Sequence, residues 1–292
     1  MDKLPYLFIL NPNSGTSIGK KAEIIGQMIR NFAEKSGNQA TVLFTKERGH
    51  ATALVRENLA KTNWKAIVAV GGDGTVNEIA RALIGTDTPV GILPLGSGNG
   101  LARHLGLPLT FEGSLKRVFE GKVITIDSAQ LNDIPFFCIA GIGFDAYVGY
   151  LFSQQSGRGL ATYVQVSVQS YWNYKAQLLR INGVETAAFS LSFANAGQFG
   201  NNAWVAPQAS LQDGLLDVCV IKPFPKWYGT SLAYRLFTKG LKNSRYIEYR
   251  NMTELLVETD TPPIIHYDGE PMQLETTRIE IKINPESLRV IV

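Results

Sequence analysis

The sequence predicts two domains: an N-terminal α/β domain with a mostly parallel sheet, and a C-terminal domain of antiparallel strands. Short β-rich runs alternate with stretches of helical periodicity up to about Leu131, which is the pattern of a parallel sheet covered by helices. From about Asn132 the pattern changes to strands joined by turn residues. A length of 292 residues also suits two domains better than one. We therefore place the domains at 1–131 and 132–292, and allow the last strand to return to the first domain.

In the first domain, strands and helices are expected to alternate along the chain. Short apolar runs, typical of buried strands, are followed by longer segments whose apolar residues recur at helical spacing. The expected strands are Tyr6–Leu10, Ala40–Phe44, Ala66–Val70 and Val90–Leu93, and the expected helices lie near Lys20–Lys35, His50–Lys61 and Val76–Ile84.

The second domain carries a clear hairpin and one ambiguous segment. Asn182-Gly183 separates the strand-like segments Gln177–Ile181 and Val184–Phe193, and this dipeptide favours a tight two-residue turn. Leu160–Trp172 has valines at alternate positions, as in a strand, but one helical face would hold Leu160, Tyr163, Val164, Val168, Tyr171 and Trp172. Its length favours a helix.

Composition is typical of a packed globular protein and excludes several other classes. Hydrophobic residues make up 45% and charged residues 18% of the chain, which excludes disordered, collagen-like and coiled-coil proteins. The apolar run Leu4–Leu10 is far shorter than the roughly 18 residues of a membrane span, and it ends in turn-forming residues. Neither a transmembrane helix nor a signal peptide is therefore expected.

Charge and cysteine content point to a cytoplasmic protein without a structural zinc. Lys and Arg number 28 against 25 Asp and Glu, an excess too small to indicate nucleic-acid binding by itself. The two cysteines, Cys138 and Cys219, lie far apart and lack the spacing of metal ligands or of a disulfide framework. They are expected to be reduced thiols in the core.

Three glycine-rich loops follow strands of the first domain, where open α/β sheets bind ligands. The first, residues 11–21, superficially resembles a P-loop. However, only three residues separate Gly15 from Gly19, and Lys21 stands where Ser or Thr would reach a metal. For this loop, a capped turn and a phosphate-binding loop remain equally open.

The second loop, residues 71–78, combines three glycines in four positions with an acidic residue. Glycines without a Cβ let the backbone approach a ligand closely. Thr75 and Glu78 have the spacing of a capping box, so they could simply begin the helix. Asp73 has no such structural explanation. A carboxylate beside phosphates needs a cation between them, which makes Asp73 a candidate Mg²⁺ ligand, directly or through water.

The third loop, residues 93–103, differs from the dinucleotide fingerprint because Leu101 stands where its third glycine would be. Taken together, the three loops predict a nucleotide phosphate site that has neither of the two commonest sequence fingerprints, the P-loop and the dinucleotide-binding motif.

Four motifs in this order resemble the catalytic core of the diacylglycerol and sphingoid-base lipid kinases. They are Asn11-Pro12-x-Ser14-Gly15, Gly71-Gly72-Asp73-Gly74-Thr75-x-x-Glu78, Leu93-Pro94-x-Gly96-Ser97-x-Asn99 and Asp268-Gly269-Glu270. The resemblance covers essentially the whole chain, and is greatest to the stand-alone soluble bacterial members. It implies an N-terminal domain of the NAD kinase and phosphofructokinase type, a C-terminal β-sandwich, and ATP bound between them.

The resemblance also implies which residues bind ATP and metal and which perform the chemistry. Glu270 would be the general base, with Asp268 in the same motif and Asp73 at the metal as further catalytic residues. Contact with ATP is implied for Asn11, Pro12, Asn13, Ser14, Gly15, Thr45, Gly71, Gly72, Asp73, Gly74, Thr75, Val76, Asn77 and Ser97. Metal binding is implied for Asp73 and Asp127, and for a second position made by Ser210, Asp213 and Leu215.

One residue departs from the family pattern. Many bacterial members have Asp after the Asn of the third loop, whereas this chain has Gly100. In the family that Asp belongs to a water-bridged magnesium network, in which Asp127 matches another acidic position. The resemblance therefore implies an altered network, and the loop is closer to that of sphingosine kinases than to that of plain diacylglycerol kinases.

The second domain offers two acidic candidates and one histidine. Gly269 would allow a sharp turn that projects Glu270, although an exposed β-turn is the commoner setting for such a tripeptide. His266 is the rival base because histidine titrates near neutral pH. Asp145 could bind a polar head group or could equally cap a helix.

A basic segment suggests where a lipid substrate is met. No acidic residue lies between Asp217 and Glu248, and a helix over Lys226–Lys242 would place Arg235, Lys239 and Lys242 opposite its apolar side. Such a helix is usually only a solvated surface, but for an enzyme acting on a lipid it becomes a candidate membrane-docking face.

The leading hypothesis is therefore an ATP- and Mg²⁺-dependent kinase that phosphorylates a hydroxyl of a membrane lipid, diacylglycerol or sphingoid-like. It would be cytoplasmic and peripheral at the inner membrane surface, and its oligomeric state is left open. NAD kinase is the rival enzyme, disfavoured by the basic segment and by the late Asp268-Gly269-Glu270. A non-catalytic nucleotide- or lipid-binding relative that lost activity with Gly100 is the third hypothesis.

Overall fold

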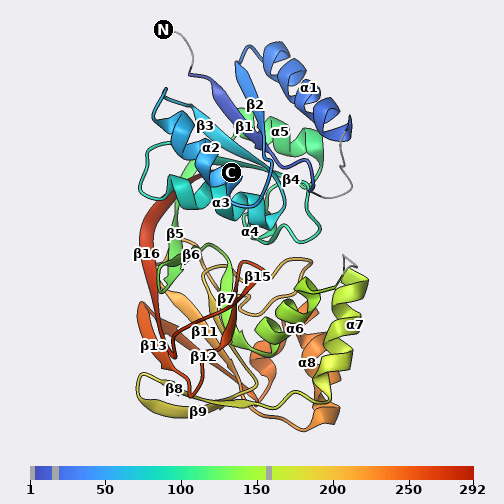
Figure 1. Ribbon diagram of the computed structural model, residues 1–292, viewed down its shortest axis with the longest axis vertical. Helices are drawn as coiled ribbons and strands as arrows, with labels where there is room; N and C mark the ends of the chain where they lie inside the picture. Colours follow the sequence, from blue (N-terminus) through green and yellow to red (C-terminus); the bar gives the residue numbers. More distant parts are fainter. Residues whose placement is uncertain (1–3, 15–19, 156–159) are drawn as a thin grey trace. The chain divides into compact units, whose positions relative to one another are not determined.

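The computed structural model describes residues 4–14, 20–155 and 160–292. The chain forms two compact units (Figure 1): Met1–Ile126 with Glu286–Val292, here called unit 1, and Asp127–Pro285, here called unit 2. The division falls at Ile126 rather than at Leu131, because strand β5 (Val123–Leu131) begins in one unit and ends in the other. The last seven residues, at the end of β16 (Arg278–Ile291) and just beyond it, belong to unit 1.

Unit 1 contains the parallel sheet that the sequence predicts. Strands β1 (Tyr6–Leu10), β2 (Ala40–Phe44), β3 (Ala66–Gly71) and β4 (Val90–Pro94) lie in the order β2-β1-β3-β4, all parallel. The end of β16 extends the sheet beside β4 through the parallel pair Val290 and Val90. Because β1, β3 and β4 are buried along their whole length, both faces of the sheet are covered.

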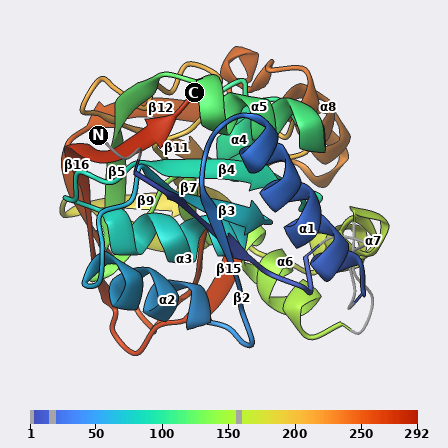
Figure 2. The same ribbon diagram turned by 90° about the horizontal axis from the view of Figure 1, so that it is seen from above.

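Helices cover the two faces of this sheet. They are α1 (Lys20–Lys35), α2 (His50–Leu59), α3 (Asp73–Leu83), α4 (Gly100–His104) and α5 (Phe111–Glu120). Figures 1 and 2 show α1 and α5 on one side of the sheet and α2 and α3 on the other. On the first side, Tyr6, Phe8 and Leu10 pack into a core with residues of α1 and α5. Helix α3 begins three residues before the expected Val76, directly after the glycines of the second loop.

Unit 2 is an antiparallel β-sandwich. One sheet has the order β12-β11-β10-β7-β14-β15; the other contains β16-β13-β8-β9, and β5 with β6. Side chains of both sheets, such as Phe193 and Val257, share one buried core. Besides β5 and β16, the strands are β6 (Ile134–Phe136), β7 (Ile139–Gly143), β8 (Gln177–Ile181), β9 (Val184–Ala188), β10 (Ser190–Ala194), β11 (Leu216–Ile221), β12 (Ile247–Met252), β13 (Glu254–Glu258), β14 (Ile264–Tyr267) and β15 (Glu270–Gln273).

The hairpin at Asn182-Gly183 joins β8 and β9 as expected, but the single strand expected over Val184–Phe193 is two strands. The chain leaves the β8–β9 sheet at Phe189 and continues as β10 in the other sheet. The N–H of Phe189 donates to Ile221 and its carbonyl accepts from Phe144. The strand-like pattern of the sequence continues through Phe189, so the sequence does not show where the chain passes from one sheet to the other.

The helices of unit 2 confirm one expectation and correct another. Leu160–Tyr171 is a helix, α7, and it follows α6 (Phe144–Ser153) along the chain. The single helix expected over Lys226–Lys242 is wrong, since the segment forms a 3₁₀ turn η1 (Lys226–Tyr228), α8 (Gly229–Phe237) and a second 3₁₀ turn η2 (Leu241–Asn243). Lys239 adopts φ 60°, and the N–H of Gly240 bonds to the carbonyl of Arg235, so the chain ends α8 with a left-handed cap.

Both cysteines are free and buried, and burial raises the pKa of the Cys219 thiol to about 12. Within the described residues, no helix is long and apolar enough to cross a bilayer.

Candidate functional site

The three glycine-rich loops converge at the carboxyl end of the unit 1 sheet. The parallel register brings the ends of β1, β3 and β4 side by side. The N–H of Asn11 donates to the carbonyl of Val70 at 3.0 Å, and the N–H of Leu95 donates to the carbonyl of Gly71 at 2.8 Å. The backbone of the second loop is therefore bonded on one side to the first loop and on the other to the third.

Two glycines are required by the close approach of these loops. A Cβ on Gly71 would lie 2.6 Å from the Oγ1 of Thr75 and 3.1 Å from the Oγ of Ser14. A Cβ on Gly96 would lie 2.7 Å from the Cα of Gly72, which belongs to the neighbouring loop. Any side chain at either position would push the loops apart.

Polar side chains of the predicted nucleotide site gather around this point. The Nδ2 of Asn11 donates to the Oγ1 of Thr75 at 3.3 Å, and the Oδ1 of Asn11 accepts the N–H of Asn13 at 2.9 Å. Ser14, Thr45 and Thr75 are buried. Gly72, the N-cap of α3, has no side chain to cover the first N–H groups of that helix, and a helix N-terminus of this kind suits an anion.

The other predicted nucleotide residues are placed differently. Ser97 is exposed in the third loop, whereas Val76 is buried inside α3. Asn77 is also buried, and its Oδ1 accepts a hydrogen bond from Arg81 one turn later. Pro12 and Gly74 are half-buried, and Gly15 lies outside the described residues. The structure therefore places Asn11, Ser14 and Thr75 close together, whereas the side chain of Asn77 bonds to Arg81 within helix α3.

Asp73 has a structural partner that the sequence does not reveal. Its Oδ2 accepts the N–H of Asn99 at 2.8 Å and its Oδ1 accepts the N–H of Gly100 at 2.7 Å. The carboxylate at the start of α3 thus holds the start of α4. Asn99, at φ 52°, fixes the turn itself by exchanging hydrogen bonds with the backbone of Gly96. The expectation that Asp73 lacks a structural explanation was wrong.

Glu78 does not complete a capping box with Thr75. Its carboxylate accepts the N–H groups of Gly49 at 2.8 Å and Ala51 at 3.1 Å, so it caps helix α2. The hydroxyl of Thr52 also donates to the carbonyl of Glu78. Spacing alone suggested a local cap, but the packing of α2 against α3 offers the carboxylate a different helix end.

In unit 2, the Asp268-Gly269-Glu270 motif forms the turn between β14 and β15. Asp268 and Gly269 have φ values of 46° and 85°, and Tyr267 pairs with Glu270 across the turn. The carboxylate of Asp268 accepts N–H groups from Phe137 at 2.9 Å and Cys138 at 2.7 Å. Asp268 therefore anchors the turn, and Glu270 follows it as the half-buried first residue of β15.

His266 is the partner of Asp145. Its Nε2 lies 2.9 Å from the Oδ2 of Asp145, and the hydroxyl of Ser190 donates to the Oδ1 at 2.9 Å. Ser192 reaches the Oδ2 at 3.4 Å. A Cβ on Gly141 would come within 2.9 Å of both members of the pair. Since the serines bond to the carboxylate and not to the imidazole, this cluster is not the arrangement of a serine nucleophile.

The hydrogen bonds of this cluster show that Asp145 does not cap a helix, which was one of its two expected roles. Its carboxylate, in the first turn of α6, binds side chains of β10 and β14 and not the N–H groups of its own helix. The sequence did not single out Ser190 and Ser192. Their spacing was the available signal, because two serines on alternate positions of a buried strand share one face.

Of the remaining predicted metal residues, Asp127 lies in strand β5, and Ser210, Asp213 and Leu215 lie in the loop before β11. The buried Asp127 accepts the N–H of Gly214 through its Oδ2 at 2.8 Å, and its own N–H donates to the carbonyl of Leu211. Asp213 accepts the N–H of Leu215 at 3.1 Å, and Ser210 accepts that of Gln212 at 3.3 Å. Asp213 and Ser210 therefore fold the loop by local bonds, whereas Asp127 ties the loop to β5.

No group of three or more His, Cys, Asp or Glu in the described part of the chain is arranged to hold a metal ion. A Mg²⁺ ion that arrives with nucleotide phosphates needs only one or two protein carboxylates. Asp73, beside the three loops, fits that need. A metal cage made of protein carboxylates alone does not fit the described residues.

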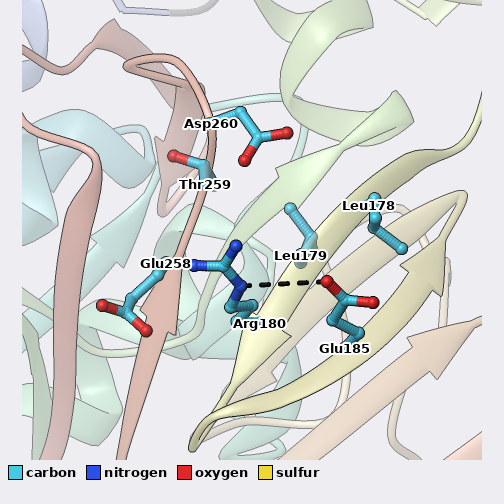
Figure 3. A pocket seen from close by; sticks show the side chains of 7 residues that line it. All are labelled: Leu178, Leu179, Arg180, Glu185, Glu258, Thr259 and Asp260. Atoms are coloured by element: carbon cyan, nitrogen blue, oxygen red, sulfur yellow. Dashed lines mark ion pairs between the residues drawn. The ribbon is translucent and has the colours of Figure 1, made fainter.

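Two surface hollows contain none of these polar side chains, although Leu95 of the third loop lines the larger one. Figure 3 shows a small one at the β8–β9 hairpin, where the Nε of Arg180 lies 4.0 Å from the Oε1 of Glu185. The other, of about 530 Å³, is lined in unit 1 by Ile25, Met28, Leu95, Thr110, Phe111 and Glu112. Neither contains the clustered polar groups described above, so the chemistry is assigned to the loops and not to the hollows.

Comparison with protein families places both halves of the chain. Residues 5–131 match the diacylglycerol kinase catalytic domain, and residues 138–292 match the YegS C-terminal NAD kinase beta sandwich-like domain. A Yersinia enterocolitica protein named "probable lipid kinase YegS-like" is 30% identical over 93% of this chain and 94% of its own length. One of the same name from Pseudomonas aeruginosa PAO1 is 29% identical over 99% and 95%. An uncharacterized Synechocystis protein is 31% identical over 77% of this chain, which spans 54% of that relative.

Solved structures share the fold. The crystal structure of a diacylglycerol kinase from Bacillus anthracis superposes with a TM-score of 0.75 at 22% identity, covering 100% of this chain and 98% of that one. An NAD kinase from Archaeoglobus fulgidus in complex with ATP superposes with a TM-score of 0.52 at 15% identity, covering 98% and 93%. These likenesses and the family matches confirm the predicted fold class and the resemblance stated from the motifs.

Proposed function

Because this chain belongs to the YegS-like lipid kinases with a diacylglycerol kinase catalytic domain, we propose that it transfers the γ-phosphoryl group of ATP to a hydroxyl of a membrane lipid, diacylglycerol or sphingoid-like. The observation that carries the proposal is the convergence of three glycine-rich loops at the half-buried start of α3. Backbone that no Cβ obstructs and a helix N-terminus together make a cradle for phosphates.

In this proposal the loops of unit 1 bind the nucleotide. Asn11, Ser14 and Thr75 supply short polar side chains beside the glycines. Mg²⁺ bound with ATP would neutralise charge on the transferred phosphoryl group, and Asp73 is the carboxylate that would hold it. Because Asp73 also fixes the start of α4, the same side chain sets the shape of the third loop.

Unit 2 supplies the acceptor side of the reaction. We assign Glu270 as the base that accepts the proton of the lipid hydroxyl while that oxygen bonds to phosphorus and the bond from phosphorus to ADP breaks. Asp268 acts as a positioning residue, since it ties the turn before Glu270 to the start of β7. Asp145, held by His266 and Ser190, is proposed to receive the polar head group.

The protein is proposed to act at the cytoplasmic face of the membrane, where the basic segment 226–242 approaches the lipid surface. The charge pattern of that segment supports this, with no acidic residue between Asp217 and Glu248.

The test is phosphate transfer from labelled ATP with Mg²⁺ to a panel of diacylglycerol, sphingosine, monoacylglycerol and NAD. Labelled lipid that is lost with Glu270→Gln supports the proposal. Labelled NAD would instead show that the protein is an NAD kinase. Binding of ATP or lipid without product on any acceptor would indicate a non-catalytic relative.

A further inference from the structure

Exposed aromatic side chains gather in one region of unit 2. Trp227 is 71% exposed, Tyr234 70%, Trp172 64% and Phe237 51%, and all four belong to α8, to η1 or to the residue that follows α7. The two tryptophans are half of the four in the chain. Large aromatic side chains exposed to this degree are costly in water, and a cluster of them marks an interaction surface.

Helix α7 presents a regular apolar stripe to solvent. Val164 and Val168 are exposed at 48% and 58%, and with Trp172 they recur every four positions, so they lie on one side of the helix. Val166 is buried on the opposite side of the helix, and at the end of α7 the ring of Tyr171 packs edge-on against Phe144. The exposed stripe is therefore additional to the face that the fold needs.

The end of α7 is joined firmly to the start of the η1–α8 segment. The Nζ of Lys226 donates to the carbonyls of Tyr171 at 2.6 Å and Tyr174 at 2.8 Å, and the hydroxyl of Tyr171 donates to the carbonyl of Lys226 at 2.6 Å. Trp172 and Trp227 each directly follow one partner of this junction. Lys226 is thus engaged at the C-terminus of α7, and its bonds fix Trp172 and Trp227 beside one junction.

The segments that carry these aromatic residues contain no acidic residue. No acidic residue occurs between Asp145 and Glu185, which includes all of α7, or between Asp217 and Glu248, which includes η1 and α8. Exposed lysines flank the aromatic residues at Lys175, Lys239 and Lys242. Apolar and amphipathic rings on segments whose charged residues are all basic complement an anionic lipid surface, with rings at the headgroup level and ammonium groups toward phosphates.

We propose that the exposed face of α7 and η1–α8, defined by Val164, Val168, Trp172, Trp227, Tyr234 and Phe237, inserts into the headgroup region of an anionic bilayer. Attraction by lysines alone, as the sequence suggested, would only bring the protein near the surface. The aromatic side chains add a contact that persists when charge is screened. This binding requires neither ATP nor catalysis, and so stands or falls separately from the kinase proposal.

The test compares vesicle binding of three variants with that of the unmodified protein. Vesicles of phosphatidylcholine with phosphatidylglycerol are sedimented, and the partition coefficient is measured at about 0.1 M and about 1 M salt. The aromatic variant is Trp172→Ala with Trp227→Ala. The charge variant is Lys175→Gln with Lys242→Gln. The matched control is Leu178→Ala with Val184→Ala, two equally exposed apolar residues of the β8–β9 hairpin in the same unit.

We expect the aromatic variant to bind about tenfold or more weakly at both salt concentrations, because it loses burial of two large rings. The charge variant should lose about fivefold per residue at low salt only, from about 1 kcal/mol for each charge. The control should bind as the unmodified protein does. Tryptophan emission of the unmodified protein should shift to the blue on vesicles and be quenched by brominated lipid.

Three results would overturn the inference. One is vesicle binding by the aromatic variant that equals that of the control. Another is a dimer in gel filtration that the aromatic variant converts to a monomer, since a second copy would then cover this face. A third is equal loss of phosphorylation on vesicles and on a short-chain soluble lipid, with a lowered melting temperature, because that pattern shows the tryptophans support the fold.

Discussion

Replacing Asp73 by Asn tests a residue to which we assign two roles, a structural one that its hydrogen bonds show and a proposed metal-binding one. The carboxylate accepts one backbone N–H on each oxygen, at 2.8 Å from Asn99 and 2.7 Å from Gly100. An Asn side chain keeps one acceptor but turns an NH₂ group toward the second N–H. One charge-assisted hydrogen bond, worth about 1.5–3 kcal/mol, is lost. Because Asp73 is half-buried, we expect about 2 kcal/mol, or a fall in melting temperature of roughly 4–8 °C.

The catalytic role should add a much larger effect. Transfer of phosphate to a short-chain soluble lipid should fall at least about a hundredfold at saturating Mg²⁺, since the metal loses its carboxylate. The matched control is Asp87→Asn, a carboxylate paired on the surface with Arg289 at 2.9 Å, which should change stability by less than about 0.5 kcal/mol. Unchanged melting would refute the structural role of Asp73, and near-normal turnover would refute the metal role.

Four further outcomes are expected. Glu270→Gln should lower kcat by about 10² or more with ATP affinity nearly intact, and the same loss in His266→Asn instead would assign the base to the histidine. His266→Asn should mainly raise the lipid KM, because it releases Asp145; an unchanged KM would remove the pair from head-group binding. Gly96→Ala should weaken ATP binding, measured by calorimetry, because its Cβ would meet the Gly72 backbone at 2.7 Å. Burial raises the pKa of the Asp217 carboxyl above 3.8 in the folded state, so the free energy of unfolding should fall as the pH rises from 3.8 to the folded-state pKa. Asp217→Asn should abolish this fall in chemical denaturation at a series of pH values. A fall that persists in the variant would refute the assignment to Asp217.

The elements of unit 1 follow from local chemistry that a sequence displays. Strands such as Ala66–Gly71 are buried on both faces, so they are apolar throughout, and the loops that follow them need glycine where a Cβ would strike a neighbour. The three glycine-rich loops and the parallel sheet could therefore be predicted. The family motifs added Glu270 and Asp268, which no periodicity would have selected.

The partners of the charged side chains could not be predicted in this way. Asp73 bonds to residues 26 and 27 positions away, and Asp268 to a backbone N–H 130 positions away. Glu78 has the spacing of a local cap, yet it caps α2, because α2 packs beside it. The same holds for His266 and Asp145, which meet only because β14 lies beside β7.

The basic segment shows the same division at the level of an element. Its helical periodicity was visible in the sequence, but the left-handed conformation of Lys239 that ends α8, and the bonds that hold Lys226 on α7, were not. By itself the sequence determined periodicity, local stereochemistry and the supply of charged groups. Only the tertiary structure decided which groups those charges meet, because a hydrogen bond acts over about 3 Å and its partner is selected by packing between distant segments.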